Sequence, residues 1–568
     1  MIARVWAPGA ERVELERGGI REPLARVDGG WWEGPELSPG ERYGFALDGG
    51  PTRPDPRGRS LPDGVHGLSE ARELPTEPVA TPGWAGRELA DAVLYELHVG
   101  TFTPAGTLDS AIERLDHLVA LGIDAVELLP VNAFNGEHGW GYDGVAWFAV
   151  HAPYGGPDAY RRFVEAAHAR GLAVVQDVVY NHLGPSGNYL PESGPYLRSE
   201  RNTWGESVNL DEPEVRRYIL DNAAMWFDEY GVDGLRLDAV HALDERGAPH
   251  LLAELAAETD ARSARRGRPL WLIAESDLND PVMFEPRSDG GHGLTAQWSD
   301  DYHHAVHVAL TGETQGYYAD FAPLSALGIA ATRGFFHAGT YSSFREREHG
   351  RPIPREAEAW RLVTFSQNHD QIGNRAAGDR ITASLSERRL AIAAVLTVLS
   401  PYTPMLFMGE EWAASTPWPF FSSHPEPELA EAVENGRLEE FARMGWNRDE
   451  IAHPQDPATF AGARLDWDEL DEPLHARMLE RYRALIALRR REPELHSPRI
   501  AELAGTWDDD ARTITLARGR IAIRVNLGDE PWRTGETADV LFTTTDAAPV
   551  EGGELVLPPD SAVVSRRG

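Results

Sequence analysis

The chain of 568 residues contains no cysteine and no lysine, so all 54 of its basic residues are arginines. Without cysteine it has no disulfide, hence no disulfide-linked oligomer, no thiolate nucleophile and no zinc–thiolate site. Without lysine it has no Gly-Lys phosphate loop, no Schiff base for pyridoxal phosphate and no lysine base. Any chemistry in this chain must therefore use carboxylates, imidazoles and hydroxyls.

Positive charge is also scarce, because 90 acidic residues against 54 arginines give a formal net charge of −36. Nucleic acids and anionic membranes bind cationic surfaces, so we expect neither as a partner and favour a neutral ligand. No apolar run approaches membrane-spanning length, and the first residues lack a basic segment followed by an apolar run. We therefore expect a cytoplasmic protein.

Three regions differ in sequence pattern. Residues 1–86 contain short alternating runs separated by glycine and proline clusters, which predicts an N-terminal β-sandwich domain. Residues 87–495 alternate between strand-like and helix-like segments and form the predicted catalytic domain. Residues 496–568 return to short alternating runs, which predicts a small C-terminal β-sandwich domain.

The middle region contains eight candidate strands, several of them followed by an amphipathic helix. Strands that alternate with helices pair in parallel through crossover connections, and eight such units most simply close into a (β/α)8 TIM barrel. The alternative α/β fold is an open doubly wound sheet, which should carry a glycine-rich phosphate turn after an early strand, and none is present. The eight runs are 92–99, 123–130, 172–179, 232–240, 270–275, 294–299, 362–366 and 405–408.

The segment Gly-Leu-Arg-Leu-Asp-Ala-Val-His at 234–241, which overlaps the fourth of these runs, carries two charged residues, Arg236 and Asp238, in an apolar context. Alternation along a strand places Arg236 and Asp238 on the same face. The guanidinium then keeps the carboxylate ionised, the state that a nucleophile needs. A structural ion pair is the alternative reading of this stretch alone.

Other polar residues also lie at the carboxyl ends of the predicted strands. Active sites of TIM barrels lie at the carboxyl ends of the strands. The third run ends in Asp177, Asn181 and His182, the fourth in Arg236 and Asp238, the fifth in Glu275, and the seventh is followed by His369 and Asp370. Several carboxylates that converge on one rim are hard to explain as separate structural pairs, so we predict an active site there.

Retaining cleavage of a glycosidic bond needs an ionised carboxylate and a protonated carboxyl group about 5 Å apart. Asp238 beside Arg236 is the candidate nucleophile. Glu275 follows the apolar run Leu-Trp-Leu-Ile-Ala, where desolvation raises a pKa and suits the residue to act as general acid and base. Asp370 can stabilise the cationic transition state. Tyr142 can offer a face for a sugar, or pack for structural reasons.

These motifs resemble those of a known enzyme family. The segments DVVYNH at 177–182, GLRLDAVH at 234–241, Glu275 in LIAES and QNHD at 367–370 are similar, in order and spacing, to the four signature regions of the α-amylase superfamily, glycoside hydrolase family 13. The resemblance implies Asp238 as nucleophile, Glu275 as acid/base and Asp370 as transition-state stabiliser. It also implies that Arg236, His182 and His369 contact the sugar.

Finer features resemble one subgroup of that family, whose members hydrolyse the α-1,4 bond next to the terminal trehalose unit of maltooligosyltrehalose. The resemblance implies that the protein acts after a maltooligosyltrehalose synthase, on that compound and related α-1,4-glucans. The features are the N-terminal β domain and the segments 297–304, 344–352, 367–375, 407–412 and 420–441.

The residues expected to contact substrate lie on the rim or in these motifs, although His303 and His304 can equally be packing residues. They are Tyr142, Asp177, His182, Arg236, His241, Asp300, Asp301, Tyr302, His303, His304, His369, Gln371 and Asn374.

Four alternatives to this activity remain. A glycogen branching enzyme shares the architecture, but its family usually has Glu where this chain has Gln371 and a second Glu where it has Ser276. An α-amylase of the same superfamily is the second. The third is a metal-dependent hydrolase using the histidines and carboxylates of the rim. The fourth is a non-catalytic glycan-binding protein. The retaining chemistry needs no metal or organic cofactor, so we predict none.

Overall fold

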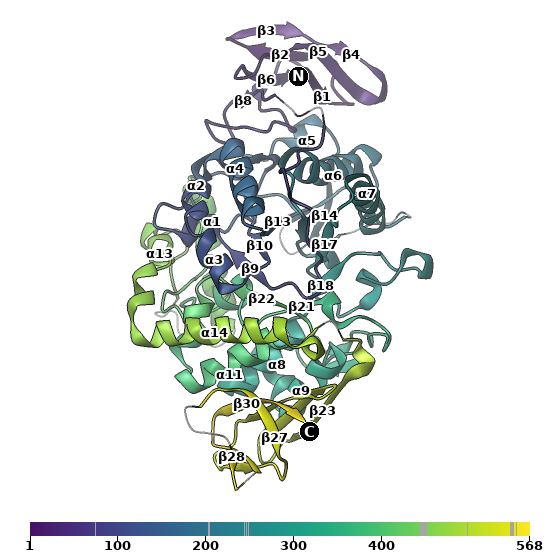
Figure 1. The fold of residues 1–568 in the computed structure, drawn as a ribbon. Helices are drawn as coiled ribbons and strands as arrows, with labels where there is room; N and C mark the ends of the chain where they lie inside the picture. Colours follow the sequence, from purple (N-terminus) through teal and green to yellow (C-terminus); the bar gives the residue numbers. More distant parts are fainter. Residues whose placement is uncertain are drawn as a thin grey trace.

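The structure is a computed structural model. It describes residues 1–568 except 74, 76, 203–204, 244, 246, 248, 444–450, 497, 546–549, 553 and 568. A central body of strands and helices lies between an N-terminal group of sheets at one end and a C-terminal group at the other (Figure 1). The expected order of β, α/β and β regions is therefore present.

Eight parallel strands close into the predicted barrel. The ring closes because the last strand, β22, pairs in parallel with the first, β9. A closed ring excludes the open doubly wound sheet. The strands are β9 (Leu94–Leu97), β10 (Ala125–Leu128), β13 (Ala173–Val178), β16 (Gly234–Leu237), β17 (Trp271–Ala274), β18 (Ala296–Trp298), β21 (Leu362–Thr364) and β22 (Thr403–Phe407).

The barrel interior has an apolar floor and a charged layer above it. The floor is a buried cluster of Leu94, Ala125, Ala173, Val175, Trp271, Ile273, Ala296, Trp298, Val363, Phe365 and Met405. Two residues further along β9, β10 and β13, on the same face, stand Glu96, Glu127 and Asp177, and all three are buried. Arg236 on β16 is in register with Asp177, and Glu127 is in register with Glu96.

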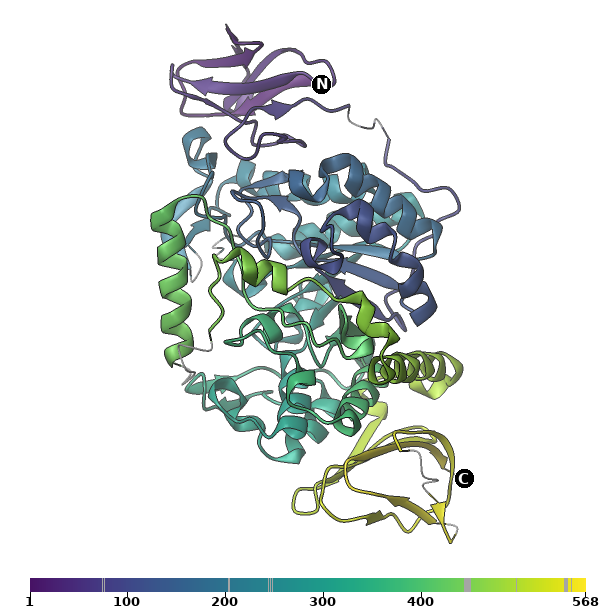
Figure 2. The ribbon, with the colours of Figure 1, turned by 90° about the vertical axis from the view of Figure 1, so that its left-hand side faces the viewer.

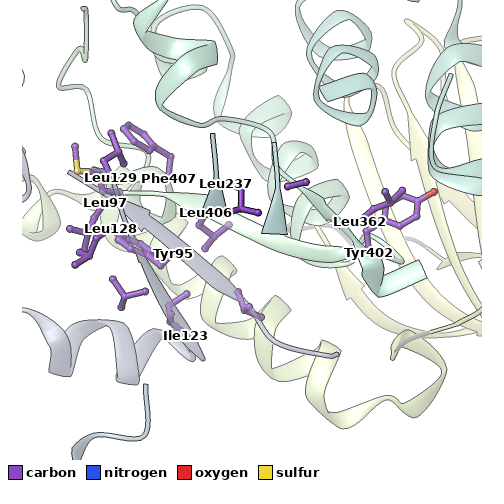
Figure 3. Packing of buried hydrophobic residues seen from close by; sticks show 14 of the residues in the cluster. Tyr95, Leu97, Ile123, Leu128, Leu129, Leu237, Leu362, Tyr402, Leu406 and Phe407 are labelled. Atoms are coloured by element: carbon purple, nitrogen blue, oxygen red, sulfur yellow. The ribbon is translucent and has the colours of Figure 1, made fainter. Parts of the chain in front are cut away.

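The outward faces of the strands pack against a ring of helices. Figure 3 shows Tyr95, Leu97, Leu128 and Leu406 within this packing. The helices are α4 (Gly156–Ala169), α6 (Pro213–Met225), α7 (Leu251–Arg266), α8 (Asp300–Thr311), α11 (Glu387–Val398) and α14 (Pro473–Arg491). Further along the chain from β9, two shorter helices, α2 (Leu108–Ile112) and α3 (Leu115–Leu121), precede Gly122, which ends α3 in the left-handed conformation at φ 103°.

The N-terminal region is a sandwich, as predicted. One sheet contains β1 (Ile2–Trp6), β5 (Trp31–Glu36) and β4 (Ala25–Arg26). The other contains β3 (Ile20–Pro23), β2 (Val13–Arg17), β6 (Arg42–Leu47), β7 (Thr52–Arg53) and β8 (Ser69–Glu70). Val5 and Trp32 of the first sheet share one core with Leu15 and Phe45 of the second.

The C-terminal region pairs a five-stranded sheet with a three-stranded one. The first contains β23 (Leu503–Asp508), β24 (Thr513–Arg518), β25 (Ile521–Asn526), β30 (Ser561–Arg567) and β27 (Ala538–Thr543). The second contains β26 (Trp532–Arg533), β29 (Glu554–Leu557) and β28 (Val550–Glu551). Helix α9 (Leu324–Arg333) packs closely on β23, because a Cβ on Gly328 would lie 2.1 Å from the Trp507 ring.

The predicted domain limits at residues 86 and 495 remain a prediction. Within the part of the chain that the structure describes, no helix is long and apolar enough to cross a membrane.

Candidate active site

The predicted acids meet at the carboxyl end of the barrel. Asp177 lies near the end of β13, and Asp238 and Glu275 are the first residues after β16 and β17. Asp370 lies in the first turn of α10 (His369–Gly373), which follows β21 and begins at Asn368, whose Oδ1 accepts the Gln371 N–H at 2.8 Å. The fold thus brings together carboxyl groups that follow different strands of the barrel.

Arg236 is the centre of this constellation. It is fully buried, and its Nη1 donates to both oxygens of Asp177 at 3.0 Å and to Asp238 Oδ1 at 2.6 Å. Its Nη2 lies 3.7 Å from Glu275 Oε2, and the guanidinium lies 4.4 Å from the centre of the Trp298 ring. One cation therefore faces three carboxyl groups. Because a structural ion pair needs only one carboxylate for each cation, the simple Arg–Asp reading does not describe this arrangement.

Asp238 accepts hydrogen bonds from two neighbours. Besides Arg236, Asn181 Nδ2 donates to Asp238 Oδ2 at 2.8 Å. Both groups stabilise a carboxylate rather than a carboxylic acid. The side chain retains 12% exposure, so the carboxylate remains partly accessible to solvent.

Glu275 is in the opposite protonation state. Burial raises the pKa of Glu275 to about 8; Arg236 opposes this rise, and the nearby acids Asp238, Asp300 and Asp370 add to it. Its Oε2 accepts the N–H of Ala239 at 2.6 Å, which fixes the orientation of the carboxyl group. Ala239 adopts a left-handed φ of 41°, a conformation that costs energy in a residue other than glycine. At pH 7 Glu275 is therefore a neutral acid that shares Arg236 with Asp238.

A chain of hydrogen bonds links Asp177 through Tyr142 and His369 to Glu96. Tyr142 O–H lies 2.6 Å from Asp177 Oδ2 and 2.8 Å from His369 Nε2, and His369 Nδ1 lies 2.6 Å from Glu96 Oε1. A hydroxyl has a single proton, so when it donates to Asp177 it must accept from His369. His369 is then an imidazolium that also donates to Glu96.

The electrostatics of His369 agree with this assignment. Burial alone lowers the pKa of His369, but Asp370 and Glu96 outweigh that effect and raise it to about 9. Tyr142 is stacked on the His369 ring at 5.2 Å, so one face of the tyrosine is already covered.

Asp370 is the most exposed of the three predicted catalytic acids, at 41%. Its Oδ2 lies 3.5 Å from His369 Nε2, and its Oδ1 accepts from Asn374 Nδ2 at 3.3 Å. Gln371 points to Asp300, with its Nε2 3.4 Å from Asp300 Oδ1. Burial raises the pKa of Asp300 to about 7, and the neighbouring carboxylate Asp370 adds to the rise.

Two of the predicted histidines lie on the rim. His182 is buried, with Nδ1 bonded to Asn181 Oδ1 and Nε2 3.1 Å from the carbonyl oxygen of Tyr142. His241 is exposed, and its Nδ1 accepts the Asp277 N–H at 3.3 Å. The structure therefore brings His182 against the catalytic residues and leaves His241 at the edge.

Two predicted substrate contacts on α8 need correction. Asp301 accepts the N–H groups of Phe336 and His337 at 2.8 and 2.7 Å, so its carboxylate anchors that loop. Tyr302 is fully buried and donates to the carbonyl oxygen of Leu396 at 2.7 Å, so it belongs to the core. The physical reason is that consecutive residues of a helix point in directions about 100° apart, so one motif cannot direct all its members to the cleft.

The two histidines that follow on α8 pack against other rings. His303 and His304 have their Nδ1 atoms 3.0 Å apart. His303 stacks on His307 at 5.5 Å, and His304 stacks on Tyr317 at 4.7 Å. Burial lowers the pKa of both histidines well below the ordinary value, so both rings are neutral. These contacts match the packing alternative for the pair.

Two buried glutamates of the charged layer were not anticipated. Glu96 binds the His369 backbone N–H at 3.0 Å as well as its ring. Glu127 is 1% exposed, and neither of its oxygens accepts a hydrogen bond from any residue that the structure describes. Burial raises the pKa of Glu127 well above its ordinary value, with Glu96 and Asp177 adding to the effect. The available signal was an acidic residue on the inward face of an otherwise apolar strand.

Comparisons with known proteins agree with this geometry. The family described as the α-amylase catalytic domain matches residues 80–207, and a domain of unknown function named DUF3459 matches residues 498–564. A crystal structure described as a putative α-amylase from Salmonella typhimurium has a TM-score of 0.92 at 35% identity, over 100% of this chain and 97% of that one. The chain belongs to the α-amylase family of glycoside hydrolases.

Curated relatives narrow the assignment. The malto-oligosyltrehalose trehalohydrolase of Rhizobium sp. (strain M-11) is 56% identical over 99% of this chain and 97% of that protein. The same enzyme of Arthrobacter ramosus is 55% identical over 99% and 98%. Within the α-amylase family, the chain is a member of the malto-oligosyltrehalose trehalohydrolases. The branching enzyme of Bacillus caldolyticus is only 26% identical over 73% of this chain, so the branching-enzyme alternative is not supported.

Proposed function

We propose that the protein hydrolyses the α-1,4-glucosidic bond next to the terminal trehalose unit of maltooligosyltrehalose and so releases trehalose and a shortened maltooligosaccharide. The observation that carries the proposal is the placement of Asp238 and the high-pKa acid Glu275 on the two terminal nitrogens of the Arg236 guanidinium. Relatives with that activity in their name, 51–56% identical over 99% of the chain, support the substrate.

The first step is formation of a glycosyl-enzyme. Glu275 donates its proton to the oxygen that leaves with trehalose, and Asp238 attacks the anomeric carbon of the maltooligosaccharide. The bond from that carbon to the leaving oxygen breaks as the bond to Asp238 forms. Arg236 and Asn181 keep Asp238 ionised and therefore nucleophilic.

The second step is hydrolysis of the intermediate. Glu275, now a carboxylate, takes a proton from water, which attacks the same carbon and frees Asp238 with the α configuration retained. Asp370 stabilises the positive charge of both transition states. The two N–H groups of the His369 imidazolium are taken by Tyr142 and Glu96, so its part is to keep a positive charge 3.5 Å from the Asp370 carboxylate.

We further propose that the enzyme acts after a synthase that forms the α,α-1,1 linkage of its substrate, in the cytoplasm and without a metal or organic cofactor. The mechanism above uses only side chains of this chain. Among the residues that the structure describes, no group of three or more His, Asp or Glu side chains is arranged to hold a metal ion. Full turnover in the presence of a chelator is the expected result, and its loss would revive the metal-dependent alternative.

Product analysis tests the substrate assignment. Purified protein is incubated separately with maltohexaose, with maltooligosyltrehalose and with a long α-glucan. Fast trehalose release from the second substrate and slow attack on the first are expected. Efficient cleavage of maltohexaose would identify an α-amylase, and new α-1,6 linkages in the long glucan would identify a branching enzyme.

A further inference from the structure

Asp370 is the least enclosed of the three predicted catalytic acids. It is 41% exposed, whereas Asp238 and Glu275 are 12% and 15% exposed. One of its oxygens lies near His369, and the other accepts from Asn374 Nδ2 at 3.3 Å. Asn374 ends α10, and its backbone N–H also donates to the Asp370 carbonyl at 3.0 Å. The amide of Asn374 therefore determines what Asp370 Oδ1 faces.

The orientation of that amide is fixed by a distant arginine. Arg437 Nη1 donates to Asn374 Oδ1 at 2.9 Å. A guanidinium has donors only, so the amide must turn its oxygen towards Arg437 and its NH2 group towards Asp370. If the amide were reversed, its oxygen would face the carboxylate, and two acceptors would repel each other.

Arg437 lies on α12 (Pro427–Arg443), a helix that stands beside the barrel and is drawn in green at the left of Figure 2. Its guanidinium lies 4.1 Å from the centre of the Phe420 ring. Phe420 meets Trp140 edge to face at 5.0 Å, and Trp140 meets His369 in the same way at 5.7 Å. Arg437 thus packs on Phe420, and contacts between aromatic rings continue from Phe420 through Trp140 to His369 in the active site.

The start of α12 is also tied to the barrel loops. Glu426, the residue before the helix, accepts from Ser186 Oγ at 2.5 Å and from Asn135 Nδ2 at 3.0 Å. Leu438 packs with the buried Ala376 and Ile451. Glu426 and Leu438 lie on either side of Arg437 in the sequence, and their contacts fix the position of α12. The backbone of Arg437 is therefore held next to α10.

We propose that Arg437 is a positioning residue, which orients Asp370 for transition-state stabilisation through the side-chain amide of Asn374. The inference rests on the proposed role of Asp370. It requires no contact between Arg437 and the substrate. It assigns to α12 a part in the chemistry of a site that the barrel otherwise builds.

The effect should appear in kcat. Asp370 acts on charge that develops in the transition state, so a misplaced Asp370 lowers kcat and changes KM little. We expect Arg437→Gln to reduce kcat about tenfold, within the range that a small misplacement of a catalytic group can cost. Arg437→Lys keeps a donor and should recover part of the loss. Asn374→Ala should lower kcat by a similar factor.

The experiment measures kcat and KM on maltooligosyltrehalose for these three variants and for Asp370→Asn, with Glu431→Gln as the control. Glu431 is exposed on the same helix, and its replacement should leave both constants unchanged. In the Asp370→Asn background, Arg437→Gln should have no further effect, and the Arg437→Gln, Asn374→Ala double variant should be no slower than either single variant.

Two outcomes would overturn the inference: a kcat for Arg437→Gln within twofold of wild type, or an equal loss from that change when Asp370 is already asparagine. If Arg437→Gln unfolds the helix, Asn374→Ala and Arg437→Lys still decide the question. Unchanged turnover in Asp370→Asn alone would instead remove the proposed role of Asp370, so the two failures are distinguishable.

Discussion

The floor and the charged layer of the barrel interior share strands, and on β9, β10 and β13 the charged residue lies two positions beyond a floor residue. Val175 and Ile273 of the floor pack against other apolar side chains. Asp177, one step above, binds Arg236 and Tyr142. The floor gains free energy by leaving water, whereas the upper layer holds more carboxyl groups than cations and must keep some of them protonated. The floor therefore contributes to stability alone, whereas the upper layer contains the reactive groups.

The largest effect on activity should come from replacing the nucleophile of the upper layer by a side chain of the same size. Asp238→Asn keeps the size of the side chain and removes the nucleophile. We expect kcat to fall by about 10³-fold or more with little change in melting temperature. A steady-state assay of trehalose release and a thermal melt measure both quantities, and a variant with wild-type turnover would sink the nucleophile assignment.

Removing the central cation should damage stability as well as activity. Arg236→Met leaves Asp177 and Asp238 in a buried site without their shared partner. Breaking a buried pair in this way costs about 3–5 kcal/mol in the free energy of unfolding. Denaturant unfolding at pH 7 checks the value. A loss below about 1 kcal/mol would show that the carboxyl groups do not depend on the guanidinium.

A change in the floor should lower stability and leave activity almost unchanged. Met405→Ala removes a fully buried side chain from β22 and leaves the acids untouched. We expect a loss of about 2–5 kcal/mol in the free energy of unfolding and a kcat within about threefold of wild type. The same denaturant and rate assays apply. A large fall in kcat in fully folded protein would mean that the two layers are not separable.

Glu127 offers the most specific change, because its effect depends on pH. Its pKa is raised in the folded state, so folding takes up a proton, and wild-type stability is lost as pH rises above the ordinary glutamate pKa of about 4.3. Glu127→Gln mimics the protonated form and lacks this loss. The difference in unfolding free energy between the two proteins should grow as pH rises above about 4.3, by about 1.4 kcal/mol per pH unit for as long as Glu127 stays protonated in the folded protein. A difference independent of pH would mean that Glu127 is ionised in the folded protein.

The sequence alone predicted the eight strands, because buried parallel strands are short apolar runs with clear ends, and it placed Asp238, Glu275 and Asp370 at one rim by the rule of strand ends. It did not reveal that Asp301 and Tyr302 face away, because the direction of a helical side chain depends on how the whole helix docks.

Contacts between distant segments were equally hidden. Arg437 and Asn374 are 63 positions apart, and no local pattern connects them. The sequence shows Glu96 and Glu127 as acidic residues within apolar strands. That they are neighbours on adjacent strands follows only from the strand register.

The central claim is that Glu275 is the neutral acid beside an ionised Asp238, and the pH dependence of kcat/KM tests it most directly. This constant should fall about tenfold per pH unit above pH 8 on maltooligosyltrehalose, as Glu275 loses its proton. An α-maltooligosyl fluoride needs no protonation of its leaving group, so its kcat/KM should show no such fall. The same alkaline limb on both substrates would contradict the account.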